Sequence, residues 1–291
     1  MLGIDKIHRG TIEAKFPFHD DEAADLLAEL LASKADINKM QIFQILTLIN
    51  NTQRQMIKTP YKIKYKRDLL IDLINGLPGD FKEIILALME TPTKYDTLQL
   101  AKAMNEKDTN ESLLIEILCL RTGLELTAIK NEYQIIIGNK LENDIAKHTN
   151  GDLKDILMII IQKPITTNDD IVDMEKIKQE VKKILGEKKK IDKTSMKSII
   201  ASLPSYQLNI LVAEYATITG HHIEQDIENP NGTRNSDLIR LIISRSEIDL
   251  ATISETYTKN YKKKLIEVIN AQCNGSYRDC LINIIKGNMK I

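Results

Sequence analysis

One segment of this chain occurs more than once, and this repetition limits the possible folds more than any other feature of the sequence. The stretch EYQIIIGNKLENDIAKHTNGDLKDIL begins at Glu132, and the related stretch ETYTKNYKKKLIEVINAQCNGSYRDCL begins at Glu255. The two align in one register without a gap, which pairs Tyr133 with Tyr257 and Gly151 with Gly275. Self-similarity at a fixed spacing is typical of proteins built from repeated structural units.

Two further copies of the repeat can be placed in the same way. One lies before the first copy and aligns Tyr61 with Tyr133, and a weaker one lies after it and aligns Tyr215 with the same tyrosine. We therefore predict four repeats. The boundaries that we expect are an N-terminal lead over 1–16, followed by repeats over 17–90, 91–162, 163–228 and 229–291.

The spacing of apolar residues within each repeat indicates helices. Leu126, Ile129 and Tyr133 recur at intervals of three and four, which is one stripe of a helix with 3.6 residues per turn, and no strict alternation is sustained. Breaks fall at clusters of Gly, Pro, Asn and Asp, as in HTNGD over 148–152. There we expect Gly151 to follow one helix in the left-handed conformation and Asp152 to cap the next. The predicted fold is all-α.

Composition and charge exclude several functional classes. The apolar content of 43% is enough to bury a core, and 40 basic against 41 acidic residues give a net charge of −1. Such a balance provides no global field for nucleic acid, so we expect no nucleic-acid partner. We also predict no enzyme, because the motifs GxSxG, HExxH and GxxxxGK[ST] are missing from the sequence.

The cysteines and the apolar runs bear on where the protein acts. Cys119, Cys273 and Cys280 contain no CxxC pair, so we interpret them as reduced thiols in a cytoplasmic protein. No apolar run reaches the roughly 18 to 20 residues that a membrane-spanning helix needs.

The repeats resemble those of the annexins. The resemblance rests on GDFKEIILALMETPTKYDTLQLAKAM, LLIEILCLRTGLELTAIKNEY and LIRLIISRSEIDL, and on the lead HRGTIEAKFPFHDDEAADLL. It implies a curved disc of four repeats, each with about five short helices, that binds anionic phospholipid through calcium on its convex face. It also implies a peripheral membrane location in the cytoplasm.

The annexin pattern has a specific calcium site in each repeat. The loop between the first two helices reads Met-Lys-Gly-x-Gly-Thr and offers carbonyl oxygens, and an acidic residue about forty positions later completes the site. Calcium takes roughly six to eight hard oxygen ligands, and glycine allows several carbonyls to converge on one ion.

The first two repeats depart from this pattern. Repeat one reads SKADIN over 33–38, and its acidic position falls on Gly76, which offers no side-chain ligand. Repeat two keeps Met104 but places Glu106 and Asp108 where the pattern has glycines, and His148 stands at the acidic position. We expect any cation in repeat two to be bound by Met104, Glu106 and Asp108 in another geometry.

The last two repeats depart as well. Repeat three reads GEKKKID over 186–192, where three lysines would repel calcium. Repeat four comes closest, with Pro230 and Gly232 in the loop and Gln272 at the acidic position, where a neutral amide oxygen coordinates only weakly. We therefore expect calcium to be bound weakly or not at all.

The distance between the last two repeats is short. The segment from Leu203 to Arg245 is only about half as long as the segment from Arg121 to Leu203, although each joins equivalent parts of neighbouring repeats. We predict that the end of repeat three and the first helix of repeat four are shortened or fused around 228–232, which could expose an edge to a partner.

The repeat-three lysines and two arginines allow two interpretations each. The lysines in and near the loop of repeat three could bind anionic headgroups without calcium, or they could form a solvated face interspersed with acids. The residues chosen for lipid binding are Lys188, Lys189, Lys190 and Lys193. For Arg121 and Arg245 we favour buried pairing with carboxylates over anion binding.

Two functions remain. The first is peripheral binding to anionic phospholipid membranes with weak or no calcium dependence. The alternative is a structural annexin associated with a cytoskeletal protein, similar to the giardins.

Overall fold

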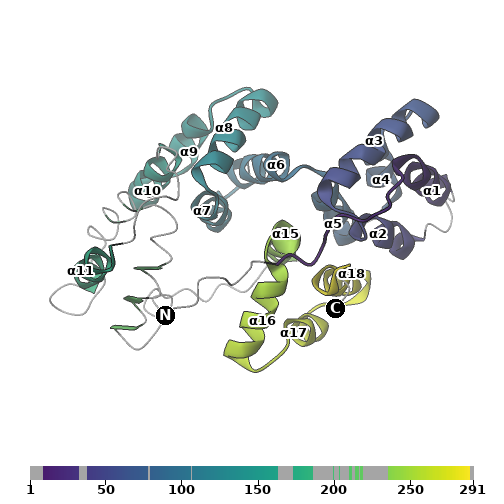
Figure 1. Ribbon diagram of the computed structural model, residues 1–291. Helices are drawn as coiled ribbons and strands as arrows, with labels where there is room; N and C mark the ends of the chain where they lie inside the picture. The colour runs from purple at the N-terminus through teal and green to yellow at the C-terminus, as the bar shows by residue number, and fades with distance from the viewer. Residues whose placement is uncertain are drawn as a thin grey trace. The chain divides into compact units, whose positions relative to one another are not determined.

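The computed structural model describes most of the chain as α-helix (Figure 1). The described residues are 9–32, 38–77, 79–105, 107–162, 173–185 and 235–288, with isolated positions at 199, 203, 210–211, 214–215 and 217–218. Every regular element in these parts is a helix, which confirms the all-α prediction. The predicted short junction around 228–232 lies outside them.

The chain divides into two compact units, one formed by residues 1–92 and 233–291 and the other by residues 93–232. Unit 1 contains α1 (Asp20–Ala32), α2 (Lys39–Thr47), α3 (Asn51–Tyr65), α4 (Leu69–Gly76), α5 (Gly79–Met89), α15 (Asn235–Ser246), α16 (Leu250–Tyr261), α17 (Leu265–Gln272) and α18 (Gly275–Lys286). Unit 2 contains α6 (Pro92–Asn105), α7 (Glu111–Leu120), α8 (Gly123–Ile137), α9 (Leu141–His148), α10 (Gly151–Gln162) and α11 (Met174–Leu185).

Equivalent helices follow the repeat spacing seen in the sequence. Helices α7, α9 and α10 begin at positions 111, 141 and 151, and α15, α17 and α18 begin at 235, 265 and 275, which is one constant shift. Helices α3, α4 and α5 begin at 51, 69 and 79, and they precede α8, α9 and α10 by another constant shift. The repeat architecture that the sequence predicted is therefore present, whereas the proposed repeat boundaries stay predictions.

A tyrosine in the third helix of repeats one and two is tied to the helix that follows. The Tyr61 hydroxyl donates to Asp72 Oδ2 at 2.6 Å, and the equivalent Tyr133 donates to Asp144 at 2.8 Å. Burial is the larger cause and the hydrogen bond to the Asp72 carboxylate the next, and together they raise the pKa of Tyr61 to about 12. The repeated Tyr-Asp spacing thus fixes the same helix corner twice.

Helix starts show how small sequence changes alter one repeat. Thr122 caps α8 with a capping box, in which its hydroxyl accepts from the Glu125 amide and Glu125 accepts from the Thr122 amide. In repeat four the equivalent of Glu125 is Asp249, whose carboxylate forms a pair with Arg245 instead. Helix α16 consequently begins at Leu250, three residues later than the repeat spacing would place it.

The break at 148–152 differs in detail from the expectation. Helix α9 ends at His148, and Gly151, with a φ of +53°, is the first residue of α10 rather than the residue that ends α9. Asp152 lies inside the first turn of α10 and does not precede it. The left-handed conformation was predicted correctly, but its place relative to the two helices was wrong.

Unit 1 packs the helices of repeat one against those of repeat four. Helix α15 lies against α5 and α18, and α18 also contacts α2 and α5, as Figure 1 shows for the purple and yellow segments. The N-terminal segment crosses both groups. The Thr11 amide donates to the Ser246 carbonyl and its hydroxyl to the Ile284 carbonyl at 2.6 Å, while the Lys15 amide donates to Gln53 Oε1 at 2.9 Å.

A buried arginine lies at the centre of this junction. Arg54, which is 1% exposed, donates to the carbonyls of Leu46, Ile49 and Leu88 at 2.8 to 2.9 Å. Its Nη2 also donates to Oε1 of Glu247 at 2.8 Å, and Glu247 lies in the turn between α15 and α16. One guanidinium therefore joins two helix ends of repeat one to repeat four.

In unit 2, repeats two and three have separate cores. Leu114, Ile117, Ile129 and Tyr133 belong to one buried cluster, whereas Ile177, Val181 and Ile184 of α11 belong to another with Tyr215. Arg121 forms two hydrogen bonds to Asp96, at 2.6 and 3.0 Å, with both side chains largely buried. This pair and the Arg245–Asp249 pair confirm the interpretation of both arginines.

We expect Arg54→Met to lower the free energy of unfolding of unit 1 by about 3 kcal/mol or more, because it leaves three buried carbonyls and one carboxylate without their donor. Urea denaturation followed by circular dichroism measures this change. Arg9→Gln, which removes an exposed pair with Glu255, serves as the control and should change stability much less. Equal stability of the two variants would contradict the role given to Arg54.

Candidate functional site

In the annexin pattern calcium is bound by the loop between the first two helices of a repeat. The structure describes this loop most fully in repeat two, between α6 and α7. The Asn110 amide donates to the Ala103 carbonyl at 2.9 Å, which closes the loop, and Asn110 Oδ1 accepts from the Leu113 amide at the start of α7. The sequence places an Asn directly before an apolar helix, and Asn is a preferred N-cap residue. The loop is thus held at both ends.

The candidate ligands of repeat two have different positions in this loop. The Met104 side chain is 2% exposed within the core, so only its carbonyl could face an ion. Asp108 is exposed, and its backbone lies outside the left-handed region that the glycine of the annexin pattern permits. Glu106 lies outside the described residues. Among the described residues of this loop, Asp108 therefore offers an accessible carboxylate.

The residues that stand where the annexin pattern has its acidic calcium ligand lie at equivalent helix ends in three repeats. Gly76, His148 and Gln272 are the last residues of α4, α9 and α17, each of eight residues. His148 is half-buried and Gln272 is exposed. The three helices thus share a length and an end, but none of them ends in a carboxylate.

These donors fit calcium poorly. Calcium prefers hard oxygen ligands, and imidazole nitrogen suits transition metals instead. Gly76 offers no side chain, His148 offers nitrogen, and Gln272 offers one neutral oxygen. Among the parts of the chain that the structure describes, no three His, Cys, Asp or Glu side chains are grouped so that they could hold a metal ion.

Other predicted site residues lie where the structure gives no description. These are Pro230 and Gly232 of the repeat-four loop, and the four lysines Lys188, Lys189, Lys190 and Lys193. Directly before these lysines, α11 buries one apolar face, and Lys182 and Lys183 are exposed. Lys183 pairs with Glu180 at 2.8 Å, so part of the positive charge at this end of α11 is already balanced.

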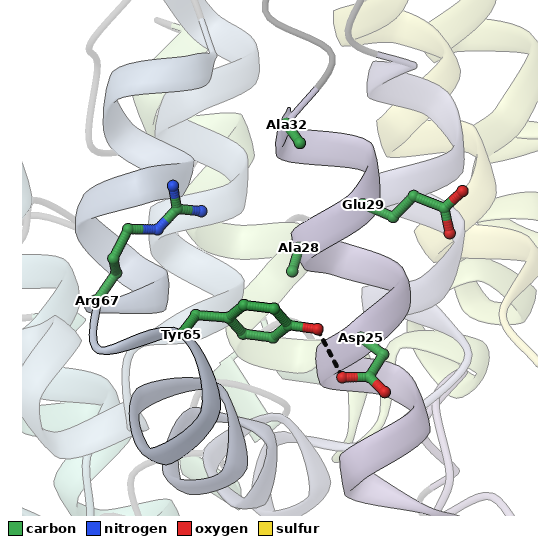
Figure 2. Close-up of a pocket in the computed structure, with 6 residues that line it drawn as sticks. All are labelled: Asp25, Ala28, Glu29, Ala32, Tyr65 and Arg67. Carbon is green, nitrogen blue, oxygen red and sulfur yellow. Dashed lines mark hydrogen bonds between the residues drawn. The ribbon is translucent and has the colours of Figure 1, made fainter.

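An open pocket of about 530 Å³ lies in repeat one, between α1 and the end of α3 (Figure 2). The Tyr65 hydroxyl donates to Asp25 Oδ1 at 2.6 Å, and Lys64 donates to the same carboxylate. The hydrogen bonds from Lys64 and then Tyr65 lower the pKa of Asp25. Arg67, which also lines the pocket, pairs with Asp72 at 2.9 Å. Because most of these charges are paired with one another, the pocket offers little to a ligand.

No helix within the described residues is both long and apolar enough to cross a bilayer.

Comparison with known proteins identifies the family. The annexin family model matches residues 23–88, 95–160 and 228–284. Mouse annexin A13 is 31% identical over 280 residues, covering 84% of this chain and 88% of its own, and human annexin A5 is 30% identical over 314 residues, covering 95% and 97%.

Solved structures of annexins and of a giardin have the same fold as this chain. Chicken annexin V superposes with a TM-score of 0.83 and 28% identity, over 97% of this chain and 100% of its own. Alpha-14 giardin, at 12% identity, shares the fold with a TM-score of 0.71, over 91% of this chain and 99% of its own. The repeated helices, the matched family and the similarity to annexins A13 and A5 along most of their length show that this chain belongs to the annexin family.

Proposed function

We propose that this annexin attaches to anionic phospholipid membranes from the cytoplasmic side with weak or no dependence on calcium. Annexins as a family bind calcium and phospholipid membranes. The observation that carries the proposal is the end of the equivalent helices α4, α9 and α17, where Gly76, His148 and Gln272 occupy the position of the acidic calcium ligand.

The lost carboxylates decide how tightly calcium could be held. Oxygen sites gain affinity with the number of charged ligands, and those with few charges reach only millimolar dissociation constants. Repeat two retains the exposed Asp108, and repeat four has Gln272 with the proposed loop residues Pro230 and Gly232. We propose these two repeats, with Met104 and Glu106 completing the first, as the places where any calcium binds.

The lysines of repeat three offer a second route to the membrane. Lys188, Lys189, Lys190 and Lys193 stand in and beside the loop that holds calcium in the annexin pattern. Each cation near a negatively charged membrane contributes about 1 kcal/mol to attachment. Fixed positive charge would then replace the bound ion.

Binding to phosphatidylserine vesicles should therefore persist in chelator and increase little on addition of calcium. Co-sedimentation with and without calcium measures this, and titration calorimetry should give a dissociation constant of about 1 mM or weaker. A micromolar constant would contradict the proposal. Lack of vesicle binding under both conditions would favour the alternative, a structural annexin associated with the cytoskeleton.

Gln272→Glu should strengthen calcium binding, because it returns a carboxylate to the end of α17. Titration calorimetry of the variant measures the change, which we expect to be about tenfold for one added charged ligand. Asn270→Glu adds the same charge at an exposed position of the same helix and should have little effect. No difference between the two variants would remove repeat four from the candidate sites.

Replacing Lys188, Lys189 and Lys190 with Gln should weaken attachment to phosphatidylserine vesicles in chelator and reduce its dependence on ionic strength. Helicity should be unchanged, since exposed lysines add little to folding. The control replaces Lys259, Lys263 and Lys264 with Gln, which removes the same charge from another exposed segment. If both variants bind vesicles as the parent does, the repeat-three lysines are a solvated face.

A further inference from the structure

The turn between α16 and α17 concentrates positive charge. Four lysines, Lys259, Lys262, Lys263 and Lys264, fall within six residues, and all four are exposed. No acidic residue occurs between Glu255 and Glu267. We call these four residues the basic corner.

The nearby carboxylates do not neutralise the basic corner. Glu255 pairs with Arg9, and Glu267 accepts a hydrogen bond from the Lys264 backbone amide at 3.2 Å. Within the described part of the chain, none of the four lysine side chains forms an ion pair with a carboxylate. The corner therefore carries four lysine charges that form no ion pair among the described residues, on a protein whose net charge is −1.

The equivalent corner of repeat one is basic but balanced. Lys64 pairs with Asp25 and Arg67 with Asp72, and Asp68 caps α4 by accepting from two backbone amides. In repeat four the equivalents of Asp68 and Asp72 are Lys264 and Val268. The same fold thus holds a corner with two ion pairs in repeat one and a corner whose lysines form none with the described residues in repeat four.

The backbone presents the basic corner in a defined conformation. Lys262 adopts the left-handed conformation, with a φ of +56°, and its amide donates to the Thr258 carbonyl at 2.9 Å. The rings of Tyr257 and Tyr261 pack with their centroids 4.7 Å apart. Little backbone freedom remains to be lost when an anion binds, which favours binding.

The basic corner and Gln272, the residue at the proposed calcium site of repeat four, lie at opposite ends of one helix. Lys264 directly precedes α17 and Gln272 ends it. Eight residues at 1.5 Å each separate the two ends by about 12 Å. If the membrane is met at the Gln272 end, as the proposed function holds, the basic corner stays open to a second partner.

We propose that the basic corner binds an acidic polypeptide segment, a run of Asp and Glu residues in a partner protein. Charge complementarity selects an anion. A bilayer is a weaker match, because the proposed function places the membrane at the Gln272 end of α17, and Lys264 lies at the other end.

The test uses fluorescence anisotropy of the full chain with a labelled octaglutamate peptide. The variant Lys262→Gly with Lys263→Asn introduces the residues that the chain uses at the equivalent turn, Gly138 and Asn139, where the same left-handed corner forms. We expect this variant to weaken peptide binding about fivefold and to flatten its dependence on salt.

The matched control is Lys62→Gln with Lys66→Gly, which removes two charges from the balanced corner of repeat one and places Gly at its left-handed residue. This control should bind the peptide within about twofold of the parent. Equal weakening by both variants would reduce the effect to net charge and overturn the proposal, as would unchanged binding in the repeat-four variant.

Two further measurements separate this inference from the proposed function. The repeat-four variant should bind phosphatidylserine vesicles as the parent does, whereas a loss of vesicle binding would assign the basic corner to the membrane. If a polyuridine oligonucleotide binds the parent more tightly than the peptide does, and the variant no longer binds it, the basic corner would be assigned to nucleic acid. Peptide binding that survives when vesicles are not bound would support the corner and contradict the membrane proposal.

Discussion

The buried guanidinium of Arg54 is the contact on which the packing of unit 1 depends. A charge out of contact with water is tolerated only when its donors are satisfied, and here the carbonyls of Leu46, Ile49 and Leu88 and the carboxylate of Glu247 accept from it. Three of these acceptors belong to repeat one and the fourth to repeat four. Glu247 also accepts from the Asn51 amide, so the ends of α2, α3 and α5 meet the turn before α16.

The repeats share the same helix contacts, and we expect function where their residues differ. The tyrosines Tyr61 and Tyr133 hold the same corner through Asp72 and Asp144 because their packing environment is the same. The ends of α4, α9 and α17 lie outside the buried core, and they differ between the repeats: they are Gly, His and Gln. In the proposed function, the identity of these three residues sets how weakly calcium is held.

Charge in this annexin is a local property. The near-neutral total predicts no global field, but it conceals the four lysines of the basic corner at the turn after α16. The lysine run at Lys188, Lys189 and Lys190 predicted a basic patch, whereas Lys263 and Lys264 carried no such prediction. A signal was available, since aligning the repeats shows that lysine and valine replace Asp68 and Asp72. Its meaning required the structure, because only there do the ion pairs of repeat one become visible.

The sequence by itself determined the repeat spacing, the all-α fold and the left-handed conformation of Gly151, because helix periodicity and turn chemistry are properties of short segments. It also showed that no carboxylate stands at the Gly76, His148 or Gln272 positions. Only the tertiary structure decided that repeat one packs against repeat four and that Arg54 is satisfied by Glu247, 193 residues away. It likewise showed that Asp249 pairs with Arg245 and leaves α16 without a side-chain cap. Such choices depend on which groups meet in space, and spacing along the chain does not encode them.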